Sequence, residues 1–374
     1  MPKKVIIFFS ETIDSPIFKN LILRLSEESL EIKFVFIGTE TEPLFKYTWN
    51  LRQDALFLGG SAKKKIGPHL FRLLNLVIKT KPSKILAFGQ TATVFSFLSS
   101  MAMPTISRIY FRGHTSMNKV EKFWRGRIYD LFSNKFSHLI IVANENTRKY
   151  LTTDEKVPRR KVQIIPFGFE LDSFSKASEY EVAQFKISQN IDSSKFLIGI
   201  VSRNSVVKGL DYSLTAVSKF LSKNRDSTLL LAGVGDIRNT PIERITNSIN
   251  PAQIKIISRT SEIETLFKSL DVFIHTPINP VVESYGLVYV EAFAAGVASI
   301  VTLSGIASEI ALDGLNCHVV DYESEQQIFS AIEKMYGDSE LRESLGANAK
   351  VTVSRLTIDA MCDGYVNMLN SDVQ

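Results

Sequence analysis

Residues 283–296, ESYGLVYVEAFAAG, carry the chemistry that this sequence signals most clearly. They follow an apolar run and a loop with two prolines, and from Leu287 onward the pattern is helical. Ser284, Tyr285 and Gly286 therefore stand where a helix begins. Free backbone N–H groups and the positive end of the helix dipole favour an anion at such a position, and a glycine lets a ligand approach the backbone closely. The sequence predicts an anion site at this helix N-terminus.

Two acidic residues belong to the same window. Glu291 follows Glu283 by about two helical turns, so both carboxylates can approach one ligand, one from the loop and one from the helix. Paired acids beside an anion site suit sugar hydroxyls, which donate hydrogen bonds to carboxylates while the helix amides hold phosphate. By spacing alone, an acid that caps the helix plus an ordinary solvated Glu remains an equal alternative.

A second group of residues follows another buried run, GIVSRNSVVKG at 199–209. Arg203 and Lys208 stand between the end of a predicted strand and the start of a helix, which is where α/β sheets bind ligands. A planar guanidinium and a mobile ammonium suit a diphosphate. Two solvated loop cations are the alternative that this motif leaves open when it stands alone.

The elements that must position these residues alternate along most of the chain. Apolar runs without internal alternation indicate parallel strands that are covered on both faces, and helical patterns lie between them. We expect an α/β fold of two Rossmann-like, doubly wound domains, made of residues 1–174 and 175–354, with a helix in 355–374 that crosses back to the first. The expected strands are 5–9, 32–37, 84–88, 105–110, 138–142 and 162–165, then 196–201, 228–232, 254–257, 272–275, 299–302 and 318–320.

Composition narrows the class of protein further. The 374 residues carry a formal net charge of +5, but residues 1–176 hold 28 Lys and Arg against 15 Asp and Glu (+13), and the remainder holds 16 against 24 (−8). The average composition excludes a disordered or collagen-like chain. Cys317 and Cys362 predict neither a disulfide framework nor a zinc site, which favours the cytoplasm. The uncharged stretch 85–107 is long enough for a membrane helix, but polar residues and Pro104 interrupt it. We therefore interpret it as a strand, a helix and a second strand.

Taken together and in order, these windows resemble the retaining glycosyltransferases of family four. The resemblance runs over roughly residues 80–340 and includes 84–114, the interdomain segment 165–174, Arg203 with Lys208 and Gly209, LAGVG at 231–235, and the Glu-x7-Glu segment with Gly296. It implies the GT-B fold, in which two Rossmann-like domains face each other across a cleft and a nucleotide-sugar is the donor.

The resemblance also implies a role for each matching residue. Arg203 and Lys208 would neutralise the donor diphosphate, Glu283 would hold hydroxyls of the transferred sugar, and Glu291 would hold the ribose. The chain around Tyr285, Gly286, Leu287 and Val288 would line the sugar and phosphate. His114, in the first domain, would face the donor sugar. Arg259 would contact the base, although a solvated loop arginine is an equal interpretation.

The function implied is transfer of a hexose, with retention, to a glycan or lipid-linked acceptor in polysaccharide biosynthesis. A UDP-sugar is favoured as the donor and a GDP-sugar is the second choice. No cofactor or metal is expected, since the chain has no DxD motif and the two cations would take a metal's place. Lys and Arg clusters at 63–65, 119–127 and 159–161 suggest peripheral contact with the inner face of a membrane, with a solvated face as the alternative. No nucleic-acid-binding module is recognisable.

Several positions depart from the family pattern. The loop after the first strand, residues 10–16, has no glycine where a Gly-Gly pair is usual. Glu170 replaces an aspartate, Ser202 replaces a glycine, and Ala298 replaces a proline. The charged residues are all kept, but the altered loop leaves open a second function, a nucleotide-sugar-binding protein of the same fold without catalysis.

Overall fold

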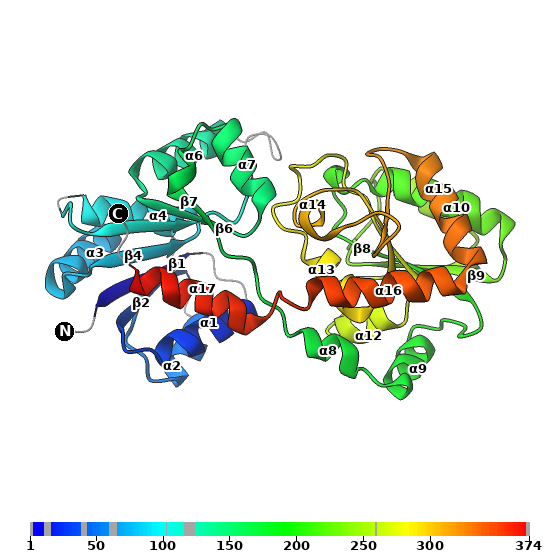
Figure 1. The fold of residues 1–374 in the computed structure, drawn as a ribbon, viewed down its shortest axis with the longest axis horizontal. Coiled ribbons are helices and arrows are strands. Elements are labelled where there is room, and N and C mark those ends of the chain that lie inside the picture. The colour runs from blue at the N-terminus through cyan, green and yellow to red at the C-terminus, as the bar shows by residue number, and fades with distance from the viewer. Residues whose placement is uncertain are drawn as a thin grey trace. The chain divides into compact units, whose positions relative to one another are not determined.

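The computed structural model describes residues 3–10, 16–38, 43–59, 66–101, 103–115, 124–258 and 260–371. The chain forms two compact units: unit 1 comprises Met1–Phe169 and Leu356–Gln374, and unit 2 comprises Glu170–Arg355 (Figure 1). Residues 170–174, which we assigned to the first domain, thus lie in unit 2, because α8 (Leu171–Lys176) packs against helices of that unit.

Unit 1 is a seven-stranded sheet in the order β3-β2-β1-β4-β5-β6-β7, with every recorded strand pair parallel. Its strands are β1 Lys4–Ser10, β2 Glu31–Gly38, β3 Ala55–Gly59, β4 Lys84–Phe88, β5 Ser107–Phe111, β6 Leu139–Val142 and β7 Val162–Ile164. Its helices are α1 Pro16–Ser26, α2 Pro43–Asn50, α3 Ile66–Thr80, α4 Gln90–Ser100, α6 Trp124–Phe136, α7 Glu145–Thr153, η1 Arg159–Lys161 and α17 Ile358–Asn370.

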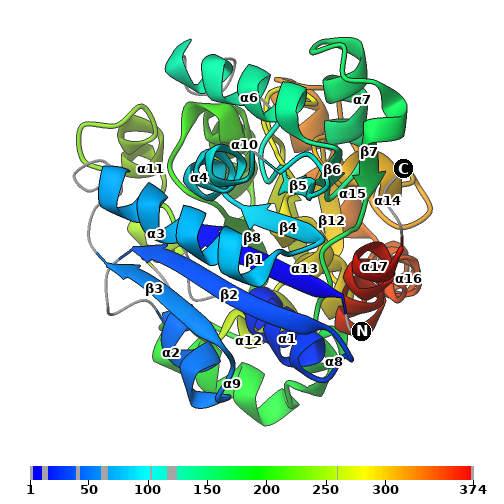
Figure 2. The same cartoon turned by 90° about the vertical axis from the view of Figure 1, so that its left-hand side faces the viewer.

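Strand β1 shows how the sequence builds both layers of unit 1. Alternate side chains of a strand point to opposite faces. Val5, Ile7 and Phe9 pack in one core with α1 and α17, whereas Ile6 and Phe8 pack in a second core with α3 and α4. Figure 2 shows α1 and α2 on one side of the sheet and α3, α4 and α6 on the other. Because both faces are covered, the strand is apolar throughout.

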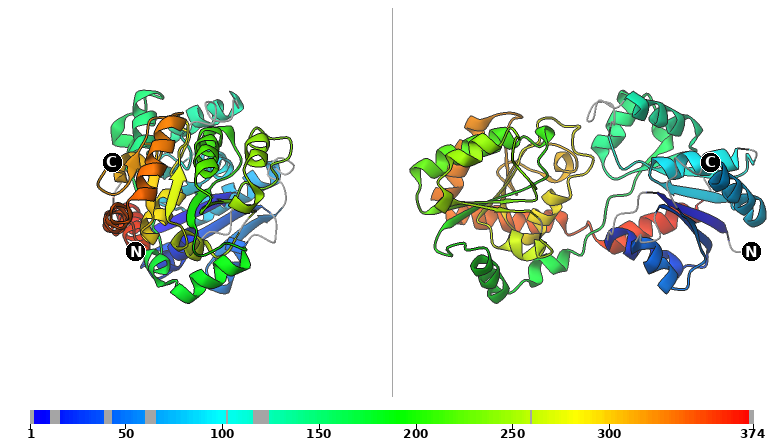
Figure 3. Two further views of the ribbon diagram at one scale, coloured as in Figure 1. Left: turned by 90° about the vertical axis from the view of Figure 1, so that its right-hand side faces the viewer. Right: turned by 180° about the vertical axis from the view of Figure 1, so that it is seen from behind.

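Unit 2 is a six-stranded parallel sheet in the order β10-β9-β8-β11-β12-β13, with helices on both faces (Figure 3). Its strands are β8 Phe196–Val201, β9 Ser227–Ala232, β10 Ile254–Ile257, β11 Val272–His275, β12 Ala298–Val301 and β13 His318–Val319. Its helices are α8, α9 Glu179–Ser188, η2 Val206–Lys208, α10 Leu210–Lys223, α11 Glu243–Ser248, η3 Pro251–Gln253, α12 Ile263–Lys268, α13 Leu287–Ala295, α14 Ala307–Ile310, α15 Glu325–Gly337 and α16 Ser339–Val353.

The expected class, two doubly wound α/β domains, is confirmed. The stretch 85–107 forms β4, α4 and the start of β5, and no helix among the described residues is long and apolar enough to cross a bilayer. Helix α17 lies in unit 1, where Tyr365 and Leu369 join the core of β1. Helix α9 lies between the predicted strands 162–165 and 196–201, and its Ser178 and Glu181 form a capping box.

Candidate functional site

The strand order of unit 2 brings the two predicted groups of residues together. The order reverses between β8 and β11, which pair in parallel at the centre of the sheet. Ligands of open α/β sheets bind at the carboxyl ends of the strands where the order reverses. Arg203 and Lys208 follow β8, and Glu283 follows β11. Residues 75 positions apart in the chain therefore meet at one edge of the sheet.

Glu283 is the centre of this site. Its side chain is only 8% exposed, and its Oε1 accepts a hydrogen bond of 2.5 Å from Lys208 Nζ. The same oxygen lies 2.8 Å from Nε2 of His275, the last residue of β11. The backbone N–H of Glu283 also donates to Ser304 Oγ at 3.2 Å. The carboxylate is therefore held in one place before any ligand arrives.

The protonation state of this group follows from its partners. Burial alone would raise the pKa of Glu283, but the hydrogen bond from His275 and the charges around it outweigh burial and lower the pKa to about 2. Burial lowers the pKa of His275, against the opposing effect of Glu283. We conclude that Glu283 is ionised near neutral pH and that His275 donates to it from Nε2–H.

His275 was not singled out from the sequence as a site residue. Its ring stacks on Phe273 and meets Tyr289 edge to face, with ring centroids 6.1 and 4.8 Å away. The sequence offered one signal for His275 as a partner of Glu283: it is a histidine at the end of an apolar strand, eight residues before a candidate acid. Packing holds the ring against the loop, so His275 orients Glu283.

Glycines allow the two loops to approach each other closely. Gly209 has φ +66°, and a Cβ there would lie 2.0 Å from the carbonyl oxygen of Thr276. Ser213 Oγ and Thr276 Oγ1 are 2.6 Å apart, which joins α10 to the loop after β11. A side chain at position 209 would force apart the loops that hold Lys208 and Glu283.

Helix α13 begins at Leu287, where the sequence predicted a helix start. Gly286 precedes the helix with φ +84°, Tyr285 is buried, Val288 is half-buried and Leu287 is partly exposed. The backbone N–H groups of the first helical turn have no intrahelical acceptor. Arg203 is exposed at the end of β8, and no ion pair to it is recorded among the described residues. Its guanidinium can therefore meet an anion without first leaving another partner.

Glu291 has a different environment from Glu283. It lies on α13, partly buried, and its charge interacts with that of Glu264 on α12. Burial, and then the Glu264 carboxylate, raise the pKa of Glu291 to about 7. The two acids of the Glu-x7-Glu segment thus differ: one is locked as an anion, and the other changes charge near neutral pH.

Two predicted site residues remain, His114 and Arg259. His114 belongs to unit 1, in the loop after β5, and its Nε2 lies 2.7 Å from Asp130 Oδ1. Arg259 lies outside the residues that the structure describes. The loop at 10–16 is described only at its ends, where Ser10 Oγ accepts a hydrogen bond of 3.0 Å from the N–H of Ala92.

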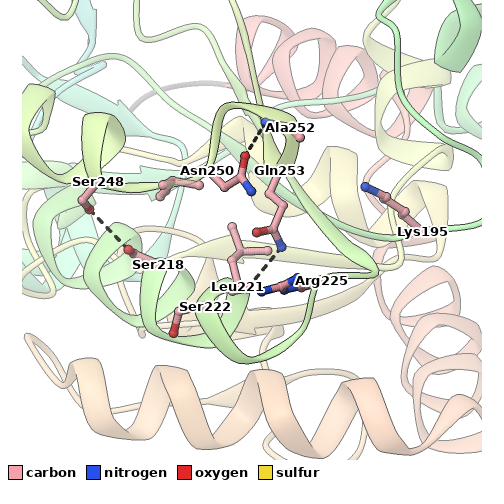
Figure 4. A pocket seen from close by; sticks show the side chains of 10 residues that line it. Lys195, Ser218, Leu221, Ser222, Arg225, Ser248, Asn250, Ala252 and Gln253 are labelled. Carbon is pink, nitrogen blue, oxygen red and sulfur yellow. Dashed lines mark hydrogen bonds between the residues drawn. The ribbon is translucent and has the colours of Figure 1, made fainter.

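Unit 2 also has a pocket of about 520 Å³ at the opposite ends of its strands (Figure 4). Lys195, Arg225 and Gln253 line it, and they precede β8, β9 and β10 respectively. Gln253 Nε2 donates to three backbone carbonyl groups, among them that of Leu221 at 3.1 Å, so its role is structural. The pocket is therefore separate from the site at the carboxyl ends.

Comparison with known proteins finds glycosyltransferases that are similar to this chain. Residues 182–352 match the model of the family Glycosyl transferases group 1. The chain is similar to an uncharacterised glycosyltransferase of Methanocaldococcus jannaschii (26% identity over 219 residues, 57% of this chain and 55% of that protein). It is also similar to the capsular polysaccharide biosynthesis glycosyltransferase CapM of Staphylococcus aureus (24% over 225 residues, 57% and 56%). The chain thus spans about half the length of these curated relatives.

Solved structures extend the likeness to both units. Anabaena HepE, crystallised with UDP, superposes with a TM-score of 0.80 at 15% identity, over 99% of this chain and 100% of that one. A second crystal structure of HepE contains UDP-glucose (TM-score 0.77, 17% identity, over 98% of this chain and 100% of that one). The match to the family Glycosyl transferases group 1 thus covers residues 182–352, within a chain that has the two-domain GT-B fold.

Proposed function

We propose that the protein is a retaining glycosyltransferase that moves a hexose from a nucleotide-sugar to a glycan or lipid-linked acceptor. The observation that carries this proposal is the buried carboxylate of Glu283, which Lys208 and His275 hold beside the start of α13. A fixed carboxylate next to cations and helix amides fits a ligand that combines hydroxyl groups with a diphosphate.

The chemistry needs little more than these groups. As the glycosidic bond to the diphosphate breaks, positive charge develops on the sugar and negative charge on the leaving group. Arg203 and Lys208 would stabilise the departing phosphate. Glu283 would accept hydrogen bonds from sugar hydroxyls, and Glu291 would accept them from the ribose. Attack by an acceptor hydroxyl on the face that the diphosphate leaves, with the hydroxyl proton passing to the departing phosphate, would give retention.

The donor is proposed to be a UDP-sugar, with a GDP-sugar as the second choice and no metal cofactor. Support comes from the crystal structures of HepE with UDP and UDP-glucose, to which this chain is similar in fold. Similarity to CapM, a capsular polysaccharide enzyme, supports a glycan or lipid-linked acceptor.

A donor panel with matched variants tests the proposal. Wild-type protein is incubated with UDP-, GDP- and ADP-sugars and an acceptor panel, and products are identified by mass and by the anomeric NMR signal. We expect one preferred donor, a product with the donor's configuration, and a loss of about a hundredfold in Arg203→Met. Arg225→Met is the control, because Arg225 is exposed at the opposite end of the strands.

Three results would contradict parts of this proposal. Equal activity in Arg203→Met and Arg225→Met would exclude the diphosphate assignment. An inverted product would exclude retention. Donor binding without turnover, across the whole acceptor panel, would favour a binding protein that lacks catalysis.

We also propose that unit 1 contacts an anionic membrane surface on the cytoplasmic side. Neighbouring helices α3, α4 and α6 expose large apolar side chains, among them Phe71 (66% exposed) and Ile128 (57%). Exposed cations flank them, including Arg72 and Arg127. Such a mixture suits the headgroup region, where each cation contributes about 1 kcal/mol. Cosedimentation with phosphatidylglycerol vesicles, but not with neutral ones, is expected, and Phe71→Asp should weaken it; equal sedimentation with both would exclude this contact.

A further inference from the structure

Unit 1 contains a buried ionic cluster next to His114. At its centre is Arg112, whose side chain is fully buried. Its guanidinium contacts Glu155 with two hydrogen bonds of 2.8 and 2.9 Å, and Asp130 with one of 3.2 Å. The three residues come from different segments: the loop after β5, helix α6, and the chain just beyond α7. The cluster therefore ties these three segments together.

The same guanidinium also fixes the backbone of the loop that carries His114. Arg112 Nε donates to the carbonyl oxygen of His114 at 3.1 Å, and Nη2 donates to that of Thr115 at 2.7 Å. The planar guanidinium presents five N–H donors in a fixed fork and can bond acceptors on several sides, whereas a lysine ammonium has only three donors. Arg112 thus sets where the loop stands before the imidazole makes any contact.

Asp130 adds the contact that fixes the imidazole itself. Its Oδ2 accepts from Arg112, and its Oδ1 lies 2.7 Å from Nε2 of His114. A carboxylate paired with an arginine only accepts hydrogen bonds. Nε2 therefore carries the proton of this bond, and in the neutral ring Nδ1 is left as an acceptor. The His114 side chain is 21% exposed, so a ligand can approach it.

We propose that Asp130 is a positioning residue that holds His114 in the tautomer whose Nδ1 accepts a hydrogen bond from a hydroxyl group of the transferred sugar. This rests on the proposed function, in which His114 faces the donor sugar. Arg112 has the supporting role of holding Asp130 and the backbone of the loop. The contacts that fix His114 all join residues of unit 1.

The chain offers a matched pair of variants for the test. Asp130→Asn and Glu155→Gln each remove one negative charge from the partners of Arg112 without changing side-chain size. Only Asp130 contacts the imidazole, because Glu155 bonds to Arg112 and Asn134 instead. Loss of stability should therefore be shared by both variants, whereas an effect on His114 should belong to Asp130→Asn alone.

The first readout is the tautomer of His114, measured by ¹⁵N NMR of the neutral imidazole. We expect protonated Nε2 and unprotonated Nδ1 in wild type and in Glu155→Gln, and a mixture of tautomers in Asp130→Asn. A protonated Nδ1 in wild type, or no change in Asp130→Asn, would overturn the proposal. This readout requires no enzymatic activity, so it stands even if the proposed function fails.

The second readout is turnover of the preferred nucleotide-sugar. We expect Asp130→Asn to lower kcat/KM about tenfold, the value of one hydrogen bond, and Glu155→Gln to change it less than twofold. Asp130→Asn combined with His114→Ala should be no worse than His114→Ala, because both act through one imidazole. Additive losses, or equal losses in the two charge variants, would refute the positioning role. A wild type inactive with every donor would instead refute the proposed function.

Discussion

Glu291→Gln should make the protein more stable and its donor binding weaker, an unusual pair of effects. The pKa of Glu291 is raised from its ordinary 4.5 to about 7 by burial and by Glu264. The folded state therefore favours the protonated acid, and an ionised carboxylate destabilises it. The destabilisation is absent below the ordinary pKa and complete above about pH 7. Gln has nearly the same shape and carries no charge, so it removes this effect.

The magnitude follows from the size of the shift. A change from 4.5 to about 7 corresponds to at most about 3 kcal/mol of unfolding free energy. For a unit of this size, about 2–4 °C in Tm accompanies each kcal/mol, so Glu291→Gln should raise Tm by about 6–12 °C above pH 7. At about pH 4 the two proteins should melt together. Scanning calorimetry measures both, and the transition of unit 2 is the one that UDP-glucose shifts.

The functional half of this prediction has the opposite sign. A carboxylate accepts hydrogen bonds from ribose hydroxyls more strongly than a carboxylic acid or an amide does. Calorimetric affinity for UDP-glucose should therefore rise in wild type as pH passes about 7, and Glu291→Gln should bind more weakly without this pH step. A stability gain that is the same at all pH values would refute the electrostatic reasoning. Unchanged binding would exclude contact with the ribose.

Three further predictions concern the loops around Glu283. Because the pKa of Glu283 is lowered to about 2, its ionised form stabilises the fold above the ordinary pKa of 4.5, and this stabilisation is lost as pH falls toward 2. Denaturant unfolding should therefore show Glu283→Gln to be about 3 kcal/mol less stable than wild type at neutral pH, with a smaller difference at acidic pH. A difference that does not change with pH would contradict this electrostatic explanation. His275→Phe keeps an aromatic ring but loses the hydrogen bond, so kcat/KM should fall about tenfold, and unchanged kinetics would exclude an orienting role. Gly209→Ala should lower the free energy of unfolding by about 2 kcal/mol more than Gly314→Ala does. Both glycines have positive φ, but of the two only position 209 would bring a Cβ against a carbonyl oxygen, that of Thr276. Equal losses of stability in thermal melts would exclude this close approach.

Much of the fold was predictable because buried parallel strands are apolar from end to end. Runs such as Val5–Phe9 and Leu229–Leu231 can hardly be anything but core strands. Strand β3 was not predicted, because it is a short edge strand of five residues that are mostly half-buried, and its hydrophobic pattern is weak. The Ser178 and Glu181 capping box was a readable signal for the start of α9 within a largely polar stretch.

Some residues of the candidate site could likewise be predicted from the sequence, and others could not. The sequence predicted that Glu283, Lys208 and Arg203 carry chemistry, because their types and their places after strands suit a diphosphate and hydroxyl groups. It did not reveal His275 as the partner of Glu283, since a histidine that ends a strand has no preferred role until its neighbours are known. The role of Asp130 beside His114 is likewise invisible, because α6 and the loop after β5 approach only in the folded unit.

By itself, the sequence determined the kinds of residue at the site, the parallel layers that carry them and the uneven division of charge between the two halves. These are local properties: side-chain chemistry, and burial patterns over five to fifteen residues. Tertiary structure alone decided that β8 lies beside β11, that one oxygen of Glu283 meets both Lys208 and His275, and that Glu291 and Glu283 differ in pKa. The physical reason is that hydrogen bonds and charge interactions depend on distances of a few ångströms between residues far apart in the chain, and only packing sets those distances.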